Sequence, residues 1–345
     1  MRALIFLKPG HLMWQEQPEL TLQGPRDAIV RPIAATTCDL DRLIIRGEAP
    51  FRGPFAIGHE CVAEVVSVGD AVAKVKRGDI VIVNWHISCA HCDRCHDGRP
   101  NACRTHQKGA MYGLPGLGDW GGTFSESLHV VEADFALTKV PAHVSPELVA
   151  SGADNLPFAF EFTVPHLRQT PGADVLVMGG CGSIALYAVM FARAAGAGRV
   201  VYRDEDPHRL DVAARLGAEV IEGPPPRQAG SFPIVVDASA HAASLLCALR
   251  SVEPEGIVSS VGGHFADVSM PLFDMYRTGV RFYTGRGRGG PNVAETLDWV
   301  ARGLVDPSPV TSEIAPFEDA PTVLAEPSLK PILTRPALYG GGKLD

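Results

Sequence analysis

The sequence predicts an α/β protein with two domains, a barrel-like β domain followed by a doubly wound parallel sheet. The length supports two domains, because 345 residues exceed what one ordinary core accommodates. A change of pattern near Pro157 supports two different architectures: short β-branched runs precede it, and strands alternating with helices follow it. We therefore expect one domain at 1–155, a second at 156–285, and a segment at 286–345 that returns to the first.

Runs of β-branched residues separated by Gly and Pro predict the strands of the first domain, with no long helical pattern between them. These runs lie at 28–34, 61–68, 79–83 and 125–131. A lobe at 86–104 is inserted after the third run. The arrangement is typical of an all-β barrel.

The second domain is predicted from buried apolar strands that alternate with helical segments. The strands are 175–178, 200–202, 235–236 and 257–258, and the helices are 184–195, 207–216 and 242–249. The alternation indicates a parallel sheet with helices on both faces. After residue 285 we expect one helix at 293–302 and then Pro-rich coil.

Composition excludes several classes of partner. The formal charge is −8 without a run of Lys or Arg, so neither nucleic acid nor an anionic membrane is expected as a partner. The longest apolar stretch, 175–192, is interrupted by three glycines and reads as a strand, turn and helix, not as a membrane span. The first ten residues do not match a signal peptide. We expect a cytoplasmic protein with reduced cysteines.

Four of the eight cysteines fall within fifteen residues, in the spacing C-x2-C-x2-C-x7-C. They are Cys89, Cys92, Cys95 and Cys103. Four thiolates at tetrahedral corners suit Zn²⁺ and leave no open position, so this zinc is expected to be structural. The alternatives are two disulfides in a secreted protein or four unrelated buried thiols, and the expected reducing compartment disfavours the disulfides.

A glycine-rich turn follows the predicted strand 175–178 and opens a helix, in the pattern G-x-G-x-x-A. Its members are Gly180, Cys181, Gly182, Ser183, Ile184 and Ala185. Glycines at this place let the backbone approach a pyrophosphate, whose charge lies at the helix N-terminus. Asp204 ends the next strand, where a carboxylate accepts hydrogen bonds from the adenosine ribose. Asp204 favours NAD over NADP, although Arg203 and Arg209 nearby could accommodate a 2′-phosphate. Without a nucleotide, Asp204 would be a solvated turn acid.

Two further candidate metal ligands precede the cysteine lobe. They are Cys38 and His59, the latter in the sequence Gly58-His59-Glu60. Taken singly, each is an ordinary buried thiol or a hydrogen-bonded histidine. A nucleotide domain and a four-cysteine lobe in the same chain favour a second metal site.

These features together resemble the zinc-dependent medium-chain alcohol dehydrogenase family over nearly the whole chain. The resemblance rests on Cys38-x-x-Asp41, Gly58-His59-Glu60, the four cysteines, Gly121-Gly122 before a strand, and the nucleotide pattern. It implies a GroES-like barrel and a Rossmann domain, with a catalytic zinc in the cleft between them. It implies two zinc ions per chain, one catalytic and one structural.

The resemblance also implies roles for individual residues. Asp154 would be the third ligand of the catalytic zinc, beside Cys38 and His59. Glu60 would be an adjacent acid that can approach or leave the metal, and Asp41 would hold the imidazole in the ligating tautomer. Trp85 would line the substrate pocket. Without the metal, Asp154 would be a helix-capping or turn acid and Trp85 a core aromatic residue.

The sequence departs from the family at the proton relay. Leu40 and Leu43 stand where a Ser or Thr and often a His pass the alcohol proton to water, and neither leucine can carry a proton. Three explanations stay open: Asp39, Thr37 or a water chain replaces the relay; the enzyme reduces a C=C or C=N bond; or the alignment near Cys38 is off by one residue.

We therefore expect a zinc- and NAD(P)-dependent oxidoreductase that transfers hydride between a nicotinamide and an alcohol/carbonyl pair, with reduction somewhat favoured. The alternatives are a reductase of an activated C=C or C=N bond, such as an enal or imine, and a sensor that binds NAD(P)H without turnover. An open zinc position disfavours the sensor. By resemblance, the partners are a small-molecule substrate and further copies of the chain, in a homodimer or homotetramer.

Overall fold

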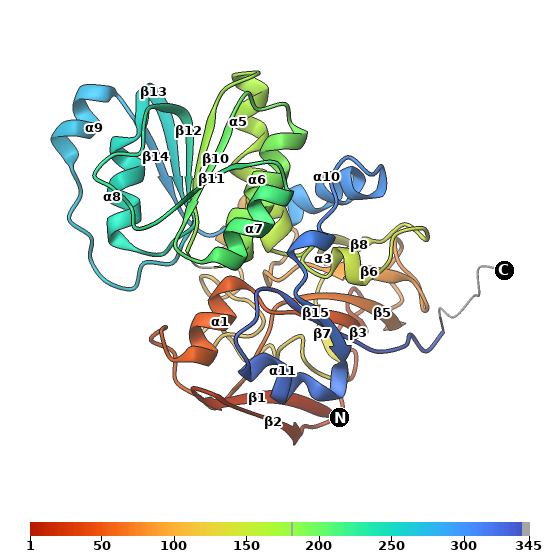
Figure 1. Cartoon of the computed structure of the whole chain (residues 1–345). Coiled ribbons are helices and arrows are strands. Elements are labelled where there is room, and N and C mark those ends of the chain that lie inside the picture. The colour runs from red at the N-terminus through yellow and green to blue at the C-terminus, as the bar shows by residue number, and fades with distance from the viewer. Residues whose placement is uncertain (181, 340–345) are drawn as a thin grey trace. The chain divides into compact units, whose positions relative to one another are not determined.

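The computed structural model describes residues 1–180 and 182–339 and divides them into two compact units. The first unit comprises Met1–Pro157, Gly287–Arg302 and the chain from Thr311 onward. The second unit comprises Phe158–Arg286 and Gly303–Val310. Figure 1 colours the chain from one end to the other and labels the elements. In the described residues, we find no helix with the length and apolar character that a membrane crossing requires.

The first unit is built on two β-sheets. The smaller has the strand order β2-β1-β4, and its strands are β1 (Arg2–Lys8), β2 (His11–Glu16) and β4 (Phe55–Ala56). The larger has the order β15-β16-β3-β5-β6-β8, with β7 paired to β3. Its strands are β3 (Ala28–Thr36), β5 (Glu60–Val68), β6 (Ile80–Val83), β7 (Leu128–Val130), β8 (Leu137–Lys139), β15 (Glu313–Pro316) and β16 (Pro331–Thr334). Every pair in it is antiparallel except β15 with β16.

The first unit also contains helices, which are α1 (Asp39–Arg46), α2 (Asp93–His96), η1 (Pro100–Ala102), α3 (Ala133–Ala136), η2 (Glu147–Val149), α10 (Gly290–Ala301), η4 (Phe317–Asp319) and α11 (Ala320–Ala325). Helix α4 (Asn155–Glu161) begins in the first unit and ends in the second. Strands β3 and β5 pair so that Thr36 lies opposite Glu60. The start of α1 and the start of β5 are therefore brought together, and both carry candidate ligands.

The second unit is a six-stranded, fully parallel sheet with the order β11-β10-β9-β12-β13-β14. Its strands are β9 (Val175–Met178), β10 (Val200–Asp204), β11 (Glu219–Glu222), β12 (Phe232–Asp237), β13 (Val252–Ser260) and β14 (Arg281–Thr284). Its helices are α5 (Val164–Gln169), α6 (Ser183–Ala194), α7 (Pro207–Arg215), α8 (Ala242–Arg250), α9 (Leu272–Thr278) and η3 (Ser308–Val310). The chain runs outward from β9 in one direction and from β12 in the other, so the right-handed crossovers put α6 and α8 on opposite faces.

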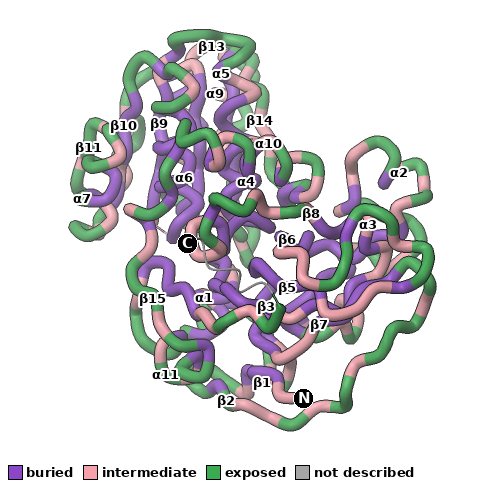
Figure 2. The backbone as a smooth tube through the Cα atoms, turned by 90° about the vertical axis from the view of Figure 1, so that its right-hand side faces the viewer, coloured by how far each residue is buried: buried purple, intermediate pink, exposed green. Residues whose placement is uncertain are grey.

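The core of the second unit centres on β9 and α6. All four residues of β9 are buried, and so are the first ten of α6. Figure 2 shows both elements in the colour of buried residues. A helix that is apolar all round needs partners on every side, and α6 contacts β9, β10 and β12 as well as α5 and α7. The Gly-rich turn between β9 and α6 is thereby fixed at the carboxyl end of the sheet.

The structure confirms the predicted fold class, and it corrects the prediction of individual elements. Helix α1 lies where no helix was expected, and the tail after residue 302 is not coil. It carries β15, α11 and β16, and β16 pairs antiparallel with β3 through Ile332 and Thr36. Strands this short, bounded by proline, gain their stability from pairing with distant strands, which a local pattern does not reveal.

Candidate metal and dinucleotide sites

Cys38 occupies the N-cap of helix α1, where its backbone is extended. Its own N–H donates to Oδ2 of Asp41 at 3.0 Å, as in a capping box. The helix start therefore fixes the direction of the thiol, which is 6% exposed.

His59 directly precedes β5, and its two ring nitrogens face two different carboxylates. Nε2 lies 3.4 Å from Oδ2 of Asp154, and Nδ1 lies 3.5 Å from Oδ1 of Asp41. The preceding Gly58 has φ +96°, and a Cβ there would lie 2.5 Å from the Phe124 ring. A residue other than glycine would strain this turn and displace the histidine.

The donor atoms of Cys38, His59 and Asp154 all lie within 4.8 Å of one another, and all three residues are buried. This spacing fits zinc, because bonds of about 2.0–2.3 Å in a tetrahedron place donor atoms roughly 3.3–3.8 Å apart. Nδ1 of His59 and Oδ1 of Asp41 are buried and face each other at 3.5 Å, and neither has a closer hydrogen-bond partner among the described residues. A metal at Nε2 would leave the proton on Nδ1, directed at Asp41. Sulfur, imidazole and carboxylate are the donors that zinc prefers.

The electrostatics of this site also fit a bound cation. Burial raises the pKa of the Cys38 thiol well above its usual range, and the carboxylates of Asp154 and Glu60 raise it further. Burial alone would lower the pKa of His59, but Asp41 and Asp154 outweigh it and raise that pKa to about 10. So many buried acidic groups favour protonation unless a cation is present, and a divalent ion would hold Cys38 as thiolate and His59 as neutral imidazole.

Glu60 is held by a lysine that the sequence did not lead us to expect. Nζ of Lys330 donates to Oε2 of Glu60 at 2.6 Å and to the Thr37 carbonyl at 2.6 Å, and both side chains of the ion pair are fully buried. Oε1 of Glu60 accepts the backbone N–H of Asn155 at 2.8 Å. Burial raises the pKa of Glu60 to about 7, although Lys330 opposes this shift. The acid beside the ligands is thus fixed from two sides.

The residues expected around the substrate differ in their surroundings. Trp85 is buried, with its ring centroid 5.6 Å from that of His59, as a residue lining this site should be. Leu40 and Leu43 lie on α1 and are half-buried. Asp39 is buried and accepts the Asn155 side-chain amide at 3.2 Å, whereas the Thr37 hydroxyl is buried without a hydrogen-bond partner.

The four cysteines of the lobe converge as the spacing predicts. Their sulfur atoms all lie within 4.8 Å of one another. Backbone N–H groups of Cys89 and Cys92 donate to the sulfurs of Cys103 and Cys89, each at 3.4 Å. Sγ of Cys92 and Sγ of Cys95 are 3.5 Å apart, far beyond a disulfide bond, and the seven described cysteines are all free. Four convergent sulfurs with N–H···S bonds fit a closed tetrahedral zinc site.

The surroundings of the lobe lower the pKa of two of its four thiols. Burial raises the pKa of Cys89, but hydrogen bonds from Thr105 and from nearby backbone outweigh it and lower that pKa to about 6. Backbone hydrogen bonds, the largest involving Arg104, also lower the pKa of Cys92. Burial raises the pKa of Cys95. Zinc binds thiolates, and the lowered pKa values of Cys89 and Cys92 favour the thiolate form of these two ligands in the absence of the metal.

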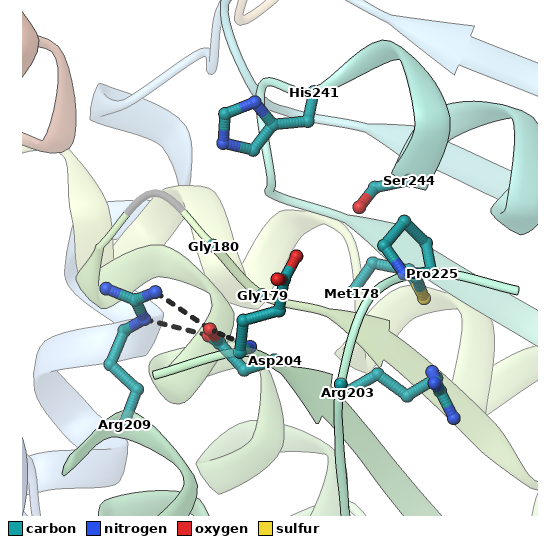
Figure 3. Close-up of a pocket in the computed structure, with 11 residues that line it drawn as sticks. Met178, Gly179, Gly180, Arg203, Asp204, Arg209, Pro225, His241 and Ser244 are labelled. Atoms are coloured by element: carbon teal, nitrogen blue, oxygen red, sulfur yellow. Dashed lines mark hydrogen bonds and ion pairs between the residues drawn. The ribbon is translucent and has the colours of Figure 1, made fainter. Parts of the chain in front are cut away.

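A pocket in the second unit lies at the carboxyl ends of β9, β10 and β12, where the strand order reverses and α/β sheets bind nucleotides. It measures ≈ 120 Å³, and its lining residues are Met178, Gly179, Gly180, Arg203, Asp204, Glu205, Arg209, Gly223, Pro225, His241 and Ser244 (Figure 3). Gly182 is the N-cap of α6, and Ser183 and Ile184 are its first residues, while Cys181 falls outside the described residues. The glycine turn, the helix start and Asp204 therefore occupy the positions that a dinucleotide requires.

These sites are of the kind that a zinc-dependent dehydrogenase carries, and comparisons with known proteins show that the chain belongs to this class. The family model of the alcohol dehydrogenase GroES-like domain matches residues 24–142, and the model of the zinc-binding dehydrogenase matches residues 183–302. The chain therefore belongs to the zinc-dependent medium-chain dehydrogenase/reductase family and is an enzyme of the dehydrogenase class.

Three relatives illustrate the similarity. A probable zinc-binding alcohol dehydrogenase of Mycobacterium tuberculosis is 32% identical over 270 residues, which are 76% of this chain and 68% of that protein. An L-threonine 3-dehydrogenase of Vibrio atlanticus is 34% identical over 222 residues, 63% of this chain and 61% of that protein. The structure of alcohol dehydrogenase TADH from Thermus sp. ATN1 has a TM-score of 0.85 and 30% identity, covering 97% of this chain and 99% of that one.

Proposed function

We propose that the chain transfers a hydride between a nicotinamide dinucleotide and a small alcohol/carbonyl substrate at a zinc ion held by Cys38, His59 and Asp154. The observation that carries this proposal is the convergence of three buried donors of the types that zinc prefers. When bound, the zinc supplies a Lewis acid for the substrate oxygen, and the nicotinamide supplies or accepts the hydride.

The residues of the chain then have separate tasks. Asp41 orients the His59 ring so that Nε2 is directed toward the metal position. Lys330 and the Asn155 N–H hold Glu60 beside the ligands, and Trp85 limits the space next to His59. Cys89, Cys92, Cys95 and Cys103 hold a second zinc that braces the first unit and takes no part in the chemistry.

Leu40 and Leu43 remove the usual proton path in both directions. Oxidation must release the alcohol proton from a buried site and carbonyl reduction must supply a proton to the same oxygen, and neither leucine can carry it, so another group or a water chain must do so. Thr37 and Asp39 are the nearby polar candidates, but Asp39 is already hydrogen-bonded to Asn155. The same observation supports a second candidate function, reduction of an activated C=C or C=N bond, in which the proton is delivered in a different geometry.

The test is loss of reduced-nicotinamide absorbance with panels of saturated aldehydes, ketones, enals and cyclic imines, and the reverse assay with alcohols. We expect turnover of saturated carbonyls and of the matching alcohols, and Asp154→Asn should abolish both. Turnover confined to enals or imines would favour the second candidate. The paired change Leu40→Ser and Leu43→His should raise both alcohol oxidation and carbonyl reduction. No gain in either direction would refute the argument from the missing relay.

A further inference from the structure

The carboxylate of Asp204 has no capacity left for a ribose. Its Oδ2 accepts the Tyr202 hydroxyl at 2.6 Å and Nε of Arg209 at 2.8 Å. Its Oδ1 accepts Nη2 of Arg209 at 2.7 Å and the backbone N–H groups of Glu205 and Asp206 at 2.7 and 3.0 Å. A carboxylate offers about four lone-pair positions, so these five donors saturate it.

Asp204 is also covered. Its side chain is 1% exposed, whereas that of Arg209 is 19% exposed. Figure 3 shows the Arg209 guanidinium lying against the carboxylate at the pocket. The Tyr202 hydroxyl covers the carboxylate on the side of the sheet. The space beside Gly179 is narrow as well, because a Cβ there would lie 2.3 Å from both this hydroxyl and Oδ2 of Asp204. Both partners line the pocket, together with Glu205, but Arg209 is the more exposed partner of the ion pair.

This arrangement changes which group of the cofactor, a ribose hydroxyl or a 2′-phosphate, the pocket can accept. A free carboxylate at the end of β10 would accept ribose hydroxyls and repel a 2′-phosphate. Here a ribose hydroxyl would first have to displace Arg209 from a bidentate, charge-assisted pair. A phosphate needs no such displacement, because a guanidinium has five N–H groups. Nε and Nη2 each donate to Asp204, and Nη1 lies 3.4 Å from Oδ2 of Asp206, which leaves further N–H groups for a phosphate.

A second arginine lines the same pocket. Nη2 of Arg203 donates to the Pro224 carbonyl at 3.2 Å, and its Nε is buried without a hydrogen-bond partner. Figure 3 shows that its guanidinium points away from Asp204. Asp204 thus pairs with Arg209 and not with Arg203, and the positive charge of Arg203 opposes that of the Glu205 carboxylate, which lines the same pocket.

We propose that Arg209, not Asp204, meets the adenosine ribose, and that the pocket accepts a 2′-phosphorylated dinucleotide, NADP, at least as readily as NAD. This rests on the proposed function, since it assumes that the chain binds a nicotinamide dinucleotide. Asp204 and Tyr202 are then positioning residues for Arg209. The expectation of NAD from the sequence assumed an accessible carboxylate.

The test is isothermal titration calorimetry of the zinc-loaded enzyme with NADPH and NADH, which measures binding without turnover. We expect the Kd of NADPH to equal or fall below that of NADH. In Arg209→Gln we expect NADPH to bind about tenfold or more weakly, because a hydrogen bond between charged groups is lost, and NADH to bind as before or more tightly. Arg215→Gln is the matched control: it removes the same charge from α7, where Arg215 pairs with Asp211 at 3.1 Å, and the Kd ratio should not change.

The possible results distinguish a failure of this inference from a failure of the proposed function. An unmodified enzyme that binds NADH more than about tenfold more tightly than NADPH overturns the inference and leaves the proposed function intact. Equal weakening of both nucleotides in Arg209→Gln also overturns it. Binding of neither dinucleotide overturns both. Titration with adenosine 2′,5′-bisphosphate and with AMP repeats the comparison for the adenosine part of the cofactor alone. Tighter binding of AMP would count against the role of Arg209.

Discussion

Replacement of Lys330 by methionine should destabilise the first unit far more than removal of an exposed lysine. Nζ of Lys330 is fully buried and makes two hydrogen bonds of 2.6 Å, one to Glu60 and one to the Thr37 carbonyl. Methionine keeps an unbranched side chain, one heavy atom shorter, and removes the charge. It leaves the Glu60 carboxylate in a dry site without its cation, a change that typically costs about 3–5 kcal/mol.

This loss in the free energy of unfolding corresponds to a large decrease in melting temperature. For a unit of 150–250 residues, 1 kcal/mol shifts Tm by about 2–4 °C, so the loss should be about 6–20 °C. Differential scanning calorimetry of the zinc-loaded protein is the suitable assay, because it separates the transitions of two units. Lys139→Met is the matched control: Lys139 pairs with Asp79 at 2.8 Å but its side chain is 52% exposed, so its loss should cost under about 1 kcal/mol.

A second variant tests the cause. Adding Glu60→Gln to Lys330→Met should recover most of the lost stability, because the neutral amide still accepts the Asn155 N–H without a buried charge. A Tm for Lys330→Met within about 2 °C of the unmodified protein would refute the reasoning, since it would mean a loss of about 1 kcal/mol or less. A double variant as unstable as the single one would show that Glu60 is not the source of the loss.

Three further predictions concern the metals and self-association. Metal analysis should find two zinc ions per chain, and Cys38→Ala should retain one; loss of both would mean that the sites depend on each other. In zinc-stripped protein, Cys92 should be alkylated first, because it is the most exposed thiol of the lobe and its pKa is lowered, whereas zinc-loaded protein should resist; mass spectrometry identifies the site. Phe273 and Tyr276 of α9 are 71% and 82% exposed, so Phe273→Glu with Tyr276→Glu should lower the mass measured by light scattering if this face joins copies of the chain, and an unchanged mass would place any such contact elsewhere.

The second unit could be predicted closely from sequence, and the reason is physical. Central strands of a parallel sheet are continuous apolar runs, so 175–178 was predicted with the bounds that β9 has. The edge strands β11 and β14 were not predicted. Strand β11 is Glu219–Glu222, with acidic residues at both ends and no buried residue, and an exposed edge leaves only a weak apolar pattern.

The candidate ligands could also be predicted, but their supports could not. Cys38, His59 and Asp154 were found from motif spacing, and the structure brings them together. Lys330 was not found, because its burial depends on β16 pairing with β3 across almost three hundred residues. Asp204 was placed correctly at the end of β10, but its pairing with Arg209 depends on how α7 begins, which the pattern does not specify.

Asp41 ties the local folding of the chain to the occupancy of the metal site. One of its oxygens caps α1 at the Cys38 N–H, and the other faces Nδ1 of His59. A ligand that binds only the folded site stabilises it by RT ln(1 + [L]/Kd). Bound zinc should therefore stabilise helix α1 as well as the metal site itself. Amide hydrogen exchange in the first turn of α1 should therefore slow when zinc binds, and Asp41→Asn should weaken that coupling. Zinc availability would then set how rigid the helix carrying Leu40 and Leu43 is.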